Sequence, residues 1–159
     1  LWNATENPYT LLPPCPCFYQ FSVLGGKLHL QLYQRSCDVF LGVPFNTAQD
    51  SLFLLIMAQV CGLPAGDFIH TFGDAHVYSN HFDQVNEQLS REPRPMPRVT
   101  INPEVKSIEE MTVEDVTLHD YDPHPSIKGQ VAVYYKTHVN SWVFLFFIYY
   151  STINTLSVP

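Results

Sequence analysis

Residues 27–36 alternate between hydrophobic and polar side chains, the period-two pattern of a strand with one buried face. Three leucines occupy the face that would be buried: Leu28, Leu30 and Leu32. A second apolar stretch, residues 17–24, precedes this strand, and Gly25-Gly26 separates the two. Because glycines readily adopt the positive φ angles of a tight turn, the pattern predicts an antiparallel hairpin.

Residues 46–61 lack this alternation and are hydrophobic on nearly every side, which predicts a helix buried in the core. We expect this helix to end at Gly62-Leu63-Pro64, because proline cannot continue it. Residues 80–91 predict a second, amphipathic helix. Further strands are predicted over residues 67–78, 98–102, 115–120 and 129–135. No repeat or low-complexity linker divides the chain, so we expect a single α+β unit.

The chain has 159 residues, 46% of them hydrophobic, which is enough for one globular domain with a substantial core. Its formal net charge of -7 argues against a general nucleic-acid surface, so we expect no DNA partner. Lys27 and Arg35 are the only cationic residues among the first ninety. An anion bound by this part of the chain would therefore depend largely on Arg35.

The four cysteines do not follow a zinc-ligand spacing, and we expect no metal. The N-terminus is polar and proline-rich rather than a cleavable signal peptide, which favours a reducing, cytoplasmic location with free thiols. We expect three of the four cysteines to be core thiols: Cys17, Cys37 and Cys61. The apolar run Trp142–Tyr150 is too short to span a bilayer, which takes about 20 residues, so no membrane partner is expected.

Cys15 follows Leu12-Pro13-Pro14 and is the candidate nucleophile. A nearby guanidinium favours the thiolate, the reactive form of a cysteine, and Arg35 is the obvious cation. Arg35 and Ser36 side by side also suit a phosphate, because both donate hydrogen bonds to anionic oxygens. A buried, unreactive thiol is the alternative for Cys15 taken alone.

Asn46 offers both a donor and an acceptor, as reading a pyrimidine edge requires, and we expect it near the N-terminus of the first helix. His76 and Tyr78 are two residues apart on a predicted strand and therefore share a face. Both could donate a hydrogen bond to a sugar hydroxyl there. Taken alone, each of the two also fits a purely structural role.

Five segments closely resemble thymidylate synthase and occur in that family's order: LPPC at residues 12–15, QRSCDVFLGVPFN at 34–46, GDFIHTFGDAHVYSNH at 66–81, QLSREPRP at 88–95 and YDPHPSIK at 121–128. The resemblance runs from about residue 11 to Val133 and covers the C-terminal half of that family. It implies a mixed β-sheet packed with a buried helix and flanking helices, and a cytoplasmic homodimer. Residues 1–133 are therefore expected to be the C-terminal part of a thymidylate synthase domain, and residues 134–159 an extension without a family counterpart.

The reaction implied by the resemblance is the reductive methylation of dUMP by 5,10-methylenetetrahydrofolate to dTMP and dihydrofolate. Cys15 would add to C6 of the uracil as a covalent catalyst. The resemblance assigns the phosphate to Arg35 and Ser36, the uracil edge to Asn46, and the deoxyribose hydroxyl to His76 and Tyr78. Two further positions match dUMP binders: Gln34 and Asp38. The positions that match folate binders are Asp38, Leu41, Gly42, Phe45 and Ala132.

The chain departs from the family at Pro16, where the family has a histidine, and at Gln49-Asp50, where it has a small and an aromatic residue. The family's N-terminal half, with its proton-transferring glutamate and folate-stacking tryptophans, lies outside the resemblance. Two alternatives remain open: a catalytically inactive remnant that binds nucleotide or dimerises, and an enzyme acting on dCMP. Asn46 disfavours the second, because an amide can accept from N3–H and donate to O4 of uracil.

Overall fold

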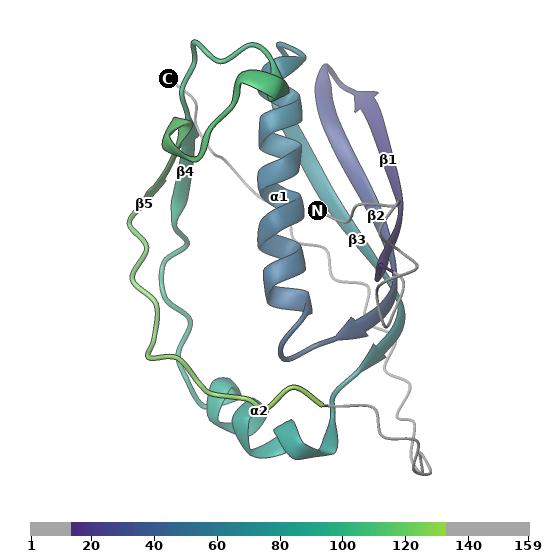
Figure 1. Ribbon diagram of the computed structural model, residues 1–159, viewed down its shortest axis with the longest axis vertical. Coiled ribbons are helices and arrows are strands. Elements are labelled where there is room, and N and C mark those ends of the chain that lie inside the picture. Colours follow the sequence, from purple (N-terminus) through teal and green to yellow (C-terminus); the bar gives the residue numbers. More distant parts are fainter. Residues whose placement is uncertain (1–13, 133–159) are drawn as a thin grey trace.

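The computed structural model describes residues 14–132 (Figure 1). Its main sheet has three strands in the order β1-β2-β3, with bounds Pro16–Leu24, Lys27–Asp38 and Ala65–His76. β1 runs antiparallel to β2, whereas β2 and β3 are parallel. The sheet is therefore mixed and the fold is α+β, which confirms the predicted fold class.

The predicted hairpin joins β1 to β2. Leu24 pairs with Lys27 across the turn, and Gly25 and Gly26 have φ angles of 58° and 76°. Positive φ at both central positions is the requirement of a type I′ turn, whose twist matches that of the flanking strands. The two glycines are needed here because other residues would be strained in this conformation.

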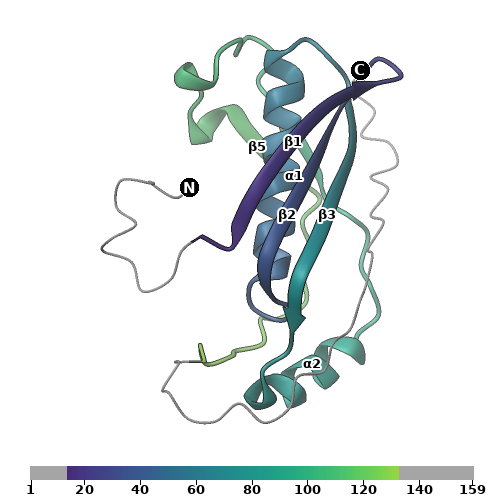
Figure 2. The ribbon, with the colours of Figure 1, turned by 90° about the vertical axis from the view of Figure 1, so that its right-hand side faces the viewer.

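The helix α1, Val43–Val60, connects the parallel strands β2 and β3 and packs on one face of the sheet. Figure 2 shows the three strands in front of it. The buried core lies between these layers and consists of Leu28, Leu30, Leu32, Leu54, Ala58 and Phe68. The alternating leucines of β2 thus supply the sheet side of the core, as their spacing predicts.

α1 differs from its prediction in two respects. It begins at Val43 rather than at residue 46, because Pro44 fits the first turn of a helix, where no intrahelical donor is required. Only the side chains that face the sheet are fully buried: Asp50, Leu54 and Ala58. The sheet covers one side of α1 (Figure 1), and the other side chains of residues 51–60 are partly buried.

The remaining elements lie at the periphery. The second predicted helix is a 3-10 turn, η2 (Ser79–His81), followed by α2 (Phe82–Leu89). Two short strands, β4 (Arg98–Ile101) and β5 (Val116–His119), form a separate antiparallel sheet. The side chain of Gln59 ties the chain after β4 to α1 by donating to the carbonyls of Asn102 and Val105 at 2.8 and 3.1 Å. Two 3-10 turns, η3 (Ile108–Glu110) and η4 (Val113–Asp115), complete this part.

The strand predicted over residues 129–135 is wrong for residues 129–132, which are irregular. Their backbone is bound by side chains instead of by a neighbouring strand: the carbonyl of Gln130 accepts from His81 Nε2 at 2.7 Å and from Asn80 Nδ2 at 3.3 Å. A backbone carbonyl that accepts hydrogen bonds from side chains in this way does not require a partner in a neighbouring strand. The rest of this predicted strand and residues 134–159, with the run Trp142–Tyr150, lie outside the described residues.

A carboxyl group lies within the layer between sheet and helix. Asp50 of α1 is 1% exposed, and its Oδ1 accepts a hydrogen bond from the Tyr19 hydroxyl of β1 at 3.1 Å. Its Oδ2 has no partner among the described residues. Burial raises the pKa of Asp50, although the bond from Tyr19 partly opposes this. Burial, followed by the charge of Asp50, raises the pKa of Tyr19 to about 12.

We expect Asp50→Asn to raise the melting temperature, and to raise it more at about pH 8 than at about pH 4. A carboxyl group whose pKa is raised by folding stabilises the fold while it is protonated, below its unfolded pKa of about 3.9. This stabilisation is lost as the pH rises through the folded pKa, and an amide avoids the loss because it does not ionise.

Thermal unfolding followed by circular dichroism measures this effect. Tyr19→Phe is the matched control: it removes the one hydrogen bond to the carboxyl group and should lower the melting temperature. An Asp50→Asn variant that unfolds at a lower temperature than the original chain at both pH values would contradict the account.

Candidate functional site

The candidate residues meet at one end of the sheet, where β2 and β3 finish and α1 begins (Figure 1). The last residues of the two parallel strands, Asp38 and His76, pair with each other, and Val39 N donates to the His76 carbonyl at 2.9 Å. The carboxyl ends of parallel strands are a common place for ligand binding in sheets of this kind. Residues far apart in the sequence are therefore gathered here by topology alone.

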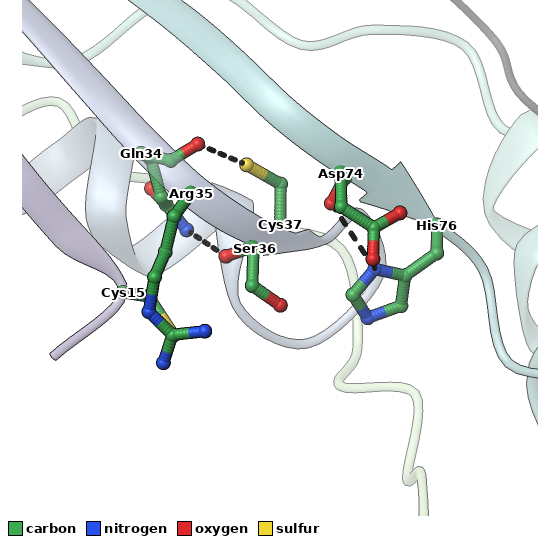
Figure 3. A network of polar contacts seen from close by, with 7 residues as sticks. All are labelled: Cys15, Gln34, Arg35, Ser36, Cys37, Asp74 and His76. Carbon is green, nitrogen blue, oxygen red and sulfur yellow. Dashed lines mark hydrogen bonds and ion pairs between the residues drawn. The ribbon is translucent and has the colours of Figure 1, made fainter. Parts of the chain in front are cut away.

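Arg35 lies against Cys15, as the sequence predicts. Its backbone N–H donates to the Cys15 carbonyl at 2.9 Å, and its Nε donates to the Pro14 carbonyl at 3.0 Å. These bonds bring Nη2 to 4.0 Å from Cys15 Sγ (Figure 3). The guanidinium is therefore the cation that lies beside the candidate nucleophile.

Ser36 and His76 lie near Arg35 at the ends of β2 and β3: Ser36 follows Arg35 on β2, and His76 is the last residue of β3 (Figure 3). Ser36 pairs with Asp74 across the β2–β3 ladder. The imidazole of His76 is held by its Nδ1, which bonds the Asp74 carbonyl at 3.2 Å and lies 3.8 Å from the Asp74 carboxylate. Its ring meets Tyr78 edge to face, with centroids 4.9 Å apart. A bond from Nδ1–H to a carbonyl leaves Nε2 as the acceptor for another group.

Gln34 is the centre of a buried hydrogen-bond network. It is 1% exposed; its Oε1 accepts from His70 Nε2 at 2.8 Å, and its Nε2 donates to Asn46 Oδ1 at 3.0 Å and to the Ser36 carbonyl at 2.9 Å. Burial lowers the pKa of His70 to about 4, so the ring is neutral at physiological pH. Its Nδ1 therefore accepts from the Thr47 hydroxyl at 3.3 Å.

This network fixes the orientation of Asn46. Since Gln34 presents its N–H groups, the atom of Asn46 that faces it must be the oxygen. The amide keeps a second lone pair on that oxygen and two N–H donors. A ligand at the start of α1 would meet this pre-oriented donor and acceptor pair.

A tight turn joins β2 to α1. Asp38 Oδ1 accepts from the N–H groups of Phe40 and Leu41, both at 3.1 Å, and the Asp38 carbonyl accepts from Gly42 N at 3.0 Å. A Cβ on Gly42 would lie 3.2 Å from that carbonyl and 3.5 Å from Asn46 Oδ1, so a glycine permits the close approach. α1 begins directly after Gly42, and Phe45 in its first turn is 77% exposed.

The segment before Ala132 lies against this turn. A Cβ on Gly129 would come within 2.8 Å of the Phe40 ring and 3.2 Å of the Leu41 side chain. His81, which is fully buried, holds the Gln130 carbonyl at 2.7 Å and packs its ring on Phe40. Ala132 follows two residues later and is half-buried.

The sequence did not indicate that His70 acts at the site, since it read as a structural histidine. The position of His70 in its strand could have indicated this role. His70 is two residues from the buried Phe68 and therefore lies on the same face of β3, which is turned towards α1. A polar side chain on a buried face needs partners, and the partners are Gln34 and Thr47.

The cysteines differ from expectation. Cys37 is fully buried, as predicted, but Cys17 and Cys61 are exposed, so their assignment as core thiols is wrong. Cys17 is the residue left unpaired where the register of β1 shifts, between Pro16 and Phe18. Cys61 follows the last residue of α1, where the chain turns towards β3.

Residues 14–132 contain no group of three or more histidine, cysteine, aspartate or glutamate side chains that could hold a metal ion. None of the helices in these residues combines the length and the apolar character needed to cross a membrane.

We expect His70 to lower the stability of the chain as the pH falls from about 6.5 to about 4, because its depressed pKa favours the fold only while the ring is neutral. The shift corresponds to at most about 3 kcal/mol. His70→Gln keeps a donor for Gln34 but does not titrate, so it should flatten this part of the profile. Denaturant unfolding at a series of pH values tests it, with His124→Gln as the control; an unchanged slope in His70→Gln would refute the assignment.

A family model described as thymidylate synthase matches residues 1–133. The match contains every candidate residue of the site, from Cys15 to Ala132, and all the elements of the main sheet. It extends over more than four fifths of the sequence. The chain belongs to the thymidylate synthase family.

Proposed function

We propose that this chain provides the nucleophile and the nucleotide-binding residues of a thymidylate synthase, a methyltransferase that converts dUMP and 5,10-methylenetetrahydrofolate to dTMP and dihydrofolate. The observation that carries the proposal is the position of the Arg35 guanidinium, 4.0 Å from Cys15 Sγ at the end of the sheet where the other candidates gather. The family membership supports the same chemistry.

The first step that the site supports is addition of the Cys15 thiolate to C6 of uracil. Attack at C6 moves negative charge towards C5 and O4, and the carbon at C5 becomes a nucleophile. An N–H of Asn46 directed at O4 would stabilise that charge, while its oxygen accepts from N3–H. The Gln34 network supports this role because it holds the amide in one orientation before the nucleotide binds.

The phosphate and the sugar of dUMP are assigned to neighbouring side chains. Arg35 and Ser36 donate to phosphate oxygens, and the charge of Arg35 offsets the charge of the phosphate. His76 and Tyr78 bind the deoxyribose hydroxyl. The bond of His76 Nδ1 to Asp74 supports this, since it leaves Nε2 as the acceptor for a hydroxyl donor.

The reduced folate supplies the one-carbon unit and the hydride when it is bound. The turn between β2 and α1 fits a flat, polar-edged ring: Phe45 offers an exposed aromatic face, and only Oδ1 of Asp38 is used within the turn. Gly42 leaves space beside Asp38 that a side chain would fill. We assign folate binding to Asp38, Leu41, Gly42 and Phe45, with Ala132 on the segment that packs against Phe40 through Gly129.

One observation favours a second candidate, a nucleotide-binding protein of low or no activity. Pro16 has neither an imidazole nor a backbone N–H at the position where the family has a histidine next to the nucleophile. We assign residues 1–133 to the C-terminal part of a thymidylate synthase domain and residues 134–159 to an extension without a family counterpart.

The free face of the sheet supports a homodimer as the working form. Phe18, Tyr33 and Ile69 lie on the face opposite α1 and are 59%, 43% and 37% exposed. They share that face because Tyr33 pairs with Phe18, and Ile69 pairs with Gln31, two residues from Tyr33. No described element covers it (Figure 2). A second copy could bury these side chains by the same face, and we expect the dimer in the cytoplasm.

We expect dUMP to protect Cys15 from alkylation by iodoacetamide, while the 159-residue chain alone forms dihydrofolate much more slowly than about 1 per second. Protection follows from occupancy of the site, and slow turnover from the loss of several groups that act together in the transition state. Peptide mapping measures the alkylation of Cys15, and a spectrophotometric assay measures the formation of dihydrofolate.

Arg35→Lys is the matched variant for this experiment, because it keeps the charge but loses the planar fork that binds a phosphate. Protection should then require a much higher dUMP concentration. Equal alkylation of Cys15 with and without dUMP would overturn the assignment of the site. Ordinary enzyme turnover by the chain alone would overturn the second expectation.

Asn46→Asp should shift the binding preference from dUMP towards dCMP by about tenfold, since one hydrogen bond gained or left unmade at a buried edge is worth roughly 1–3 kcal/mol. A protonated carboxyl group can pair with N3 and the 4-amino group of cytosine, and its oxygen still accepts from Gln34. Competition binding of the two nucleotides measures the preference. Asn46→Ala should weaken dUMP more than dCMP and so remove most of the preference; an unchanged preference in Asn46→Asp would mean that residue 46 does not face the base.

A further inference from the structure

Two cysteines separated by one residue stand at the start of β1. Cys15 is half-buried and Cys17 is exposed, and both are free thiols. The Cys17 thiol is turned back along the chain, and its Sγ donates to the Cys15 carbonyl at 3.4 Å. The proposed reaction uses only Cys15, so the second thiol has no assigned role.

The backbone at this point favours a close approach of the two residues. In a regular strand, residues two apart have Cα atoms about 6.7 Å apart, near the upper end of the range of roughly 4.4–6.8 Å that a disulfide spans. This stretch is not regular: Pro16 pairs with Gln34 and Phe18 pairs with Tyr33, which leaves Cys17 as an extra, bulged residue. A bulge bends its strand and shortens it locally.

The surroundings give the two thiols different parts in an oxidation. The Arg35 guanidinium lies 4.0 Å from Cys15 Sγ, and a cation beside a partly exposed thiol is the usual setting of a cysteine that attacks an oxidant. Cys17 is exposed to solvent and adjacent, as expected of a thiol that resolves the first product. Solvent accessibility and a neighbouring second cysteine are usual features of redox-sensitive cysteines.

The other two cysteines are poor partners for Cys15. Cys37 is fully buried, and its Sγ donates to the Gln34 carbonyl at 3.3 Å. Burial raises the pKa of Cys37 to about 12, with smaller contributions from the nearby charges of Cys15, Asp74 and Cys17, so this thiol stays protonated. Cys61 lies at the far end of α1, a helix about 27 Å long.

We propose that Cys15 and Cys17 form a reversible disulfide that blocks the nucleophile. In the first step the Cys15 thiolate attacks one sulfur of a small disulfide such as oxidised glutathione; a new S–S bond forms, the old one breaks, and one glutathione thiolate leaves. In the second step Cys17 loses its proton to solvent and attacks the Cys15 sulfur, which releases the second glutathione thiolate. The two cysteines are oxidised by two electrons, and the glutathione disulfide is reduced to two thiols.

The bond should be easily reduced, because a loop closed over a single residue is strained and strained disulfides are the labile ones. The formation of the disulfide depends only on the thiols and their geometry. Its effect on catalysis rests on the proposed role of Cys15, so the two parts are tested by different measurements.

In the test, the full chain carrying Cys61→Ser is treated with oxidised glutathione. The substitution removes the other exposed thiol. Intact mass should show the loss of two hydrogen atoms without a lasting glutathione adduct, and peptide mapping should place the disulfide between Cys15 and Cys17. Alkylation of Cys15 should be lost completely and return after treatment with dithiothreitol.

The matched variant adds Cys17→Ser, which keeps the size and a hydroxyl donor but cannot form the bond. It should retain glutathione on Cys15. The proposal is overturned if the parent keeps the same adduct, if the disulfide maps to Cys37, or if Cys15 does not react. The proposed function is tested separately, by the protection of Cys15 by dUMP. The disulfide proposal can therefore fail while the proposed function holds, and the reverse.

Discussion

The side chain of Gln34 joins the three elements on which the site depends. It belongs to β2, accepts from His70 of β3 and donates to Asn46 of α1, and both Gln34 and His70 are buried. A buried amide with an unmade hydrogen bond is costly, so the three elements must keep their relative positions for the network to be complete. The register of the parallel strands and the start of the helix are thereby coupled to one residue.

The same strand builds the core and the site. The leucines of β2 fill the face turned to α1, and Gln34 continues that face by two more residues. The alternate face carries Arg35 to Cys15. Because the side-chain period of a strand is two, a register slip of one residue would move the leucines out of the core and turn both site residues to the wrong sides. Core packing therefore specifies the geometry of the chemistry.

Local patterns in the sequence were sufficient for the hairpin, the helices and the short strands, since each depends on neighbours along the chain. The glycine pair and the alternating leucines are examples. The proximity of Arg35 to Cys15 also followed, from a hairpin that brings the ends of its strands together. These features rest on period and turn chemistry, which a single sequence contains.

The remaining features depend on contacts between distant segments. His70 joins the site only because β3 lies parallel to β2, a register that no local pattern encodes. The strand predicted at residue 129 failed because His81 and Asn80 bind its backbone from 49 and 50 residues earlier. The exposure of Cys17 follows from a bulge, whose position is set by the pairing of β1 with β2.

The bulge at Cys17 also bears on the outer edge of the sheet. Among the strands of residues 14–132, β1 lies at the edge of the main sheet, and an edge strand can add a strand from another molecule by continuing the ladder. Pro16 offers no N–H to such a ladder, and the extra residue that follows interrupts the spacing of the next donors and acceptors. The substitution that separates this chain from its family next to the nucleophile thus makes the beginning of β1 a poor template for intermolecular strand addition.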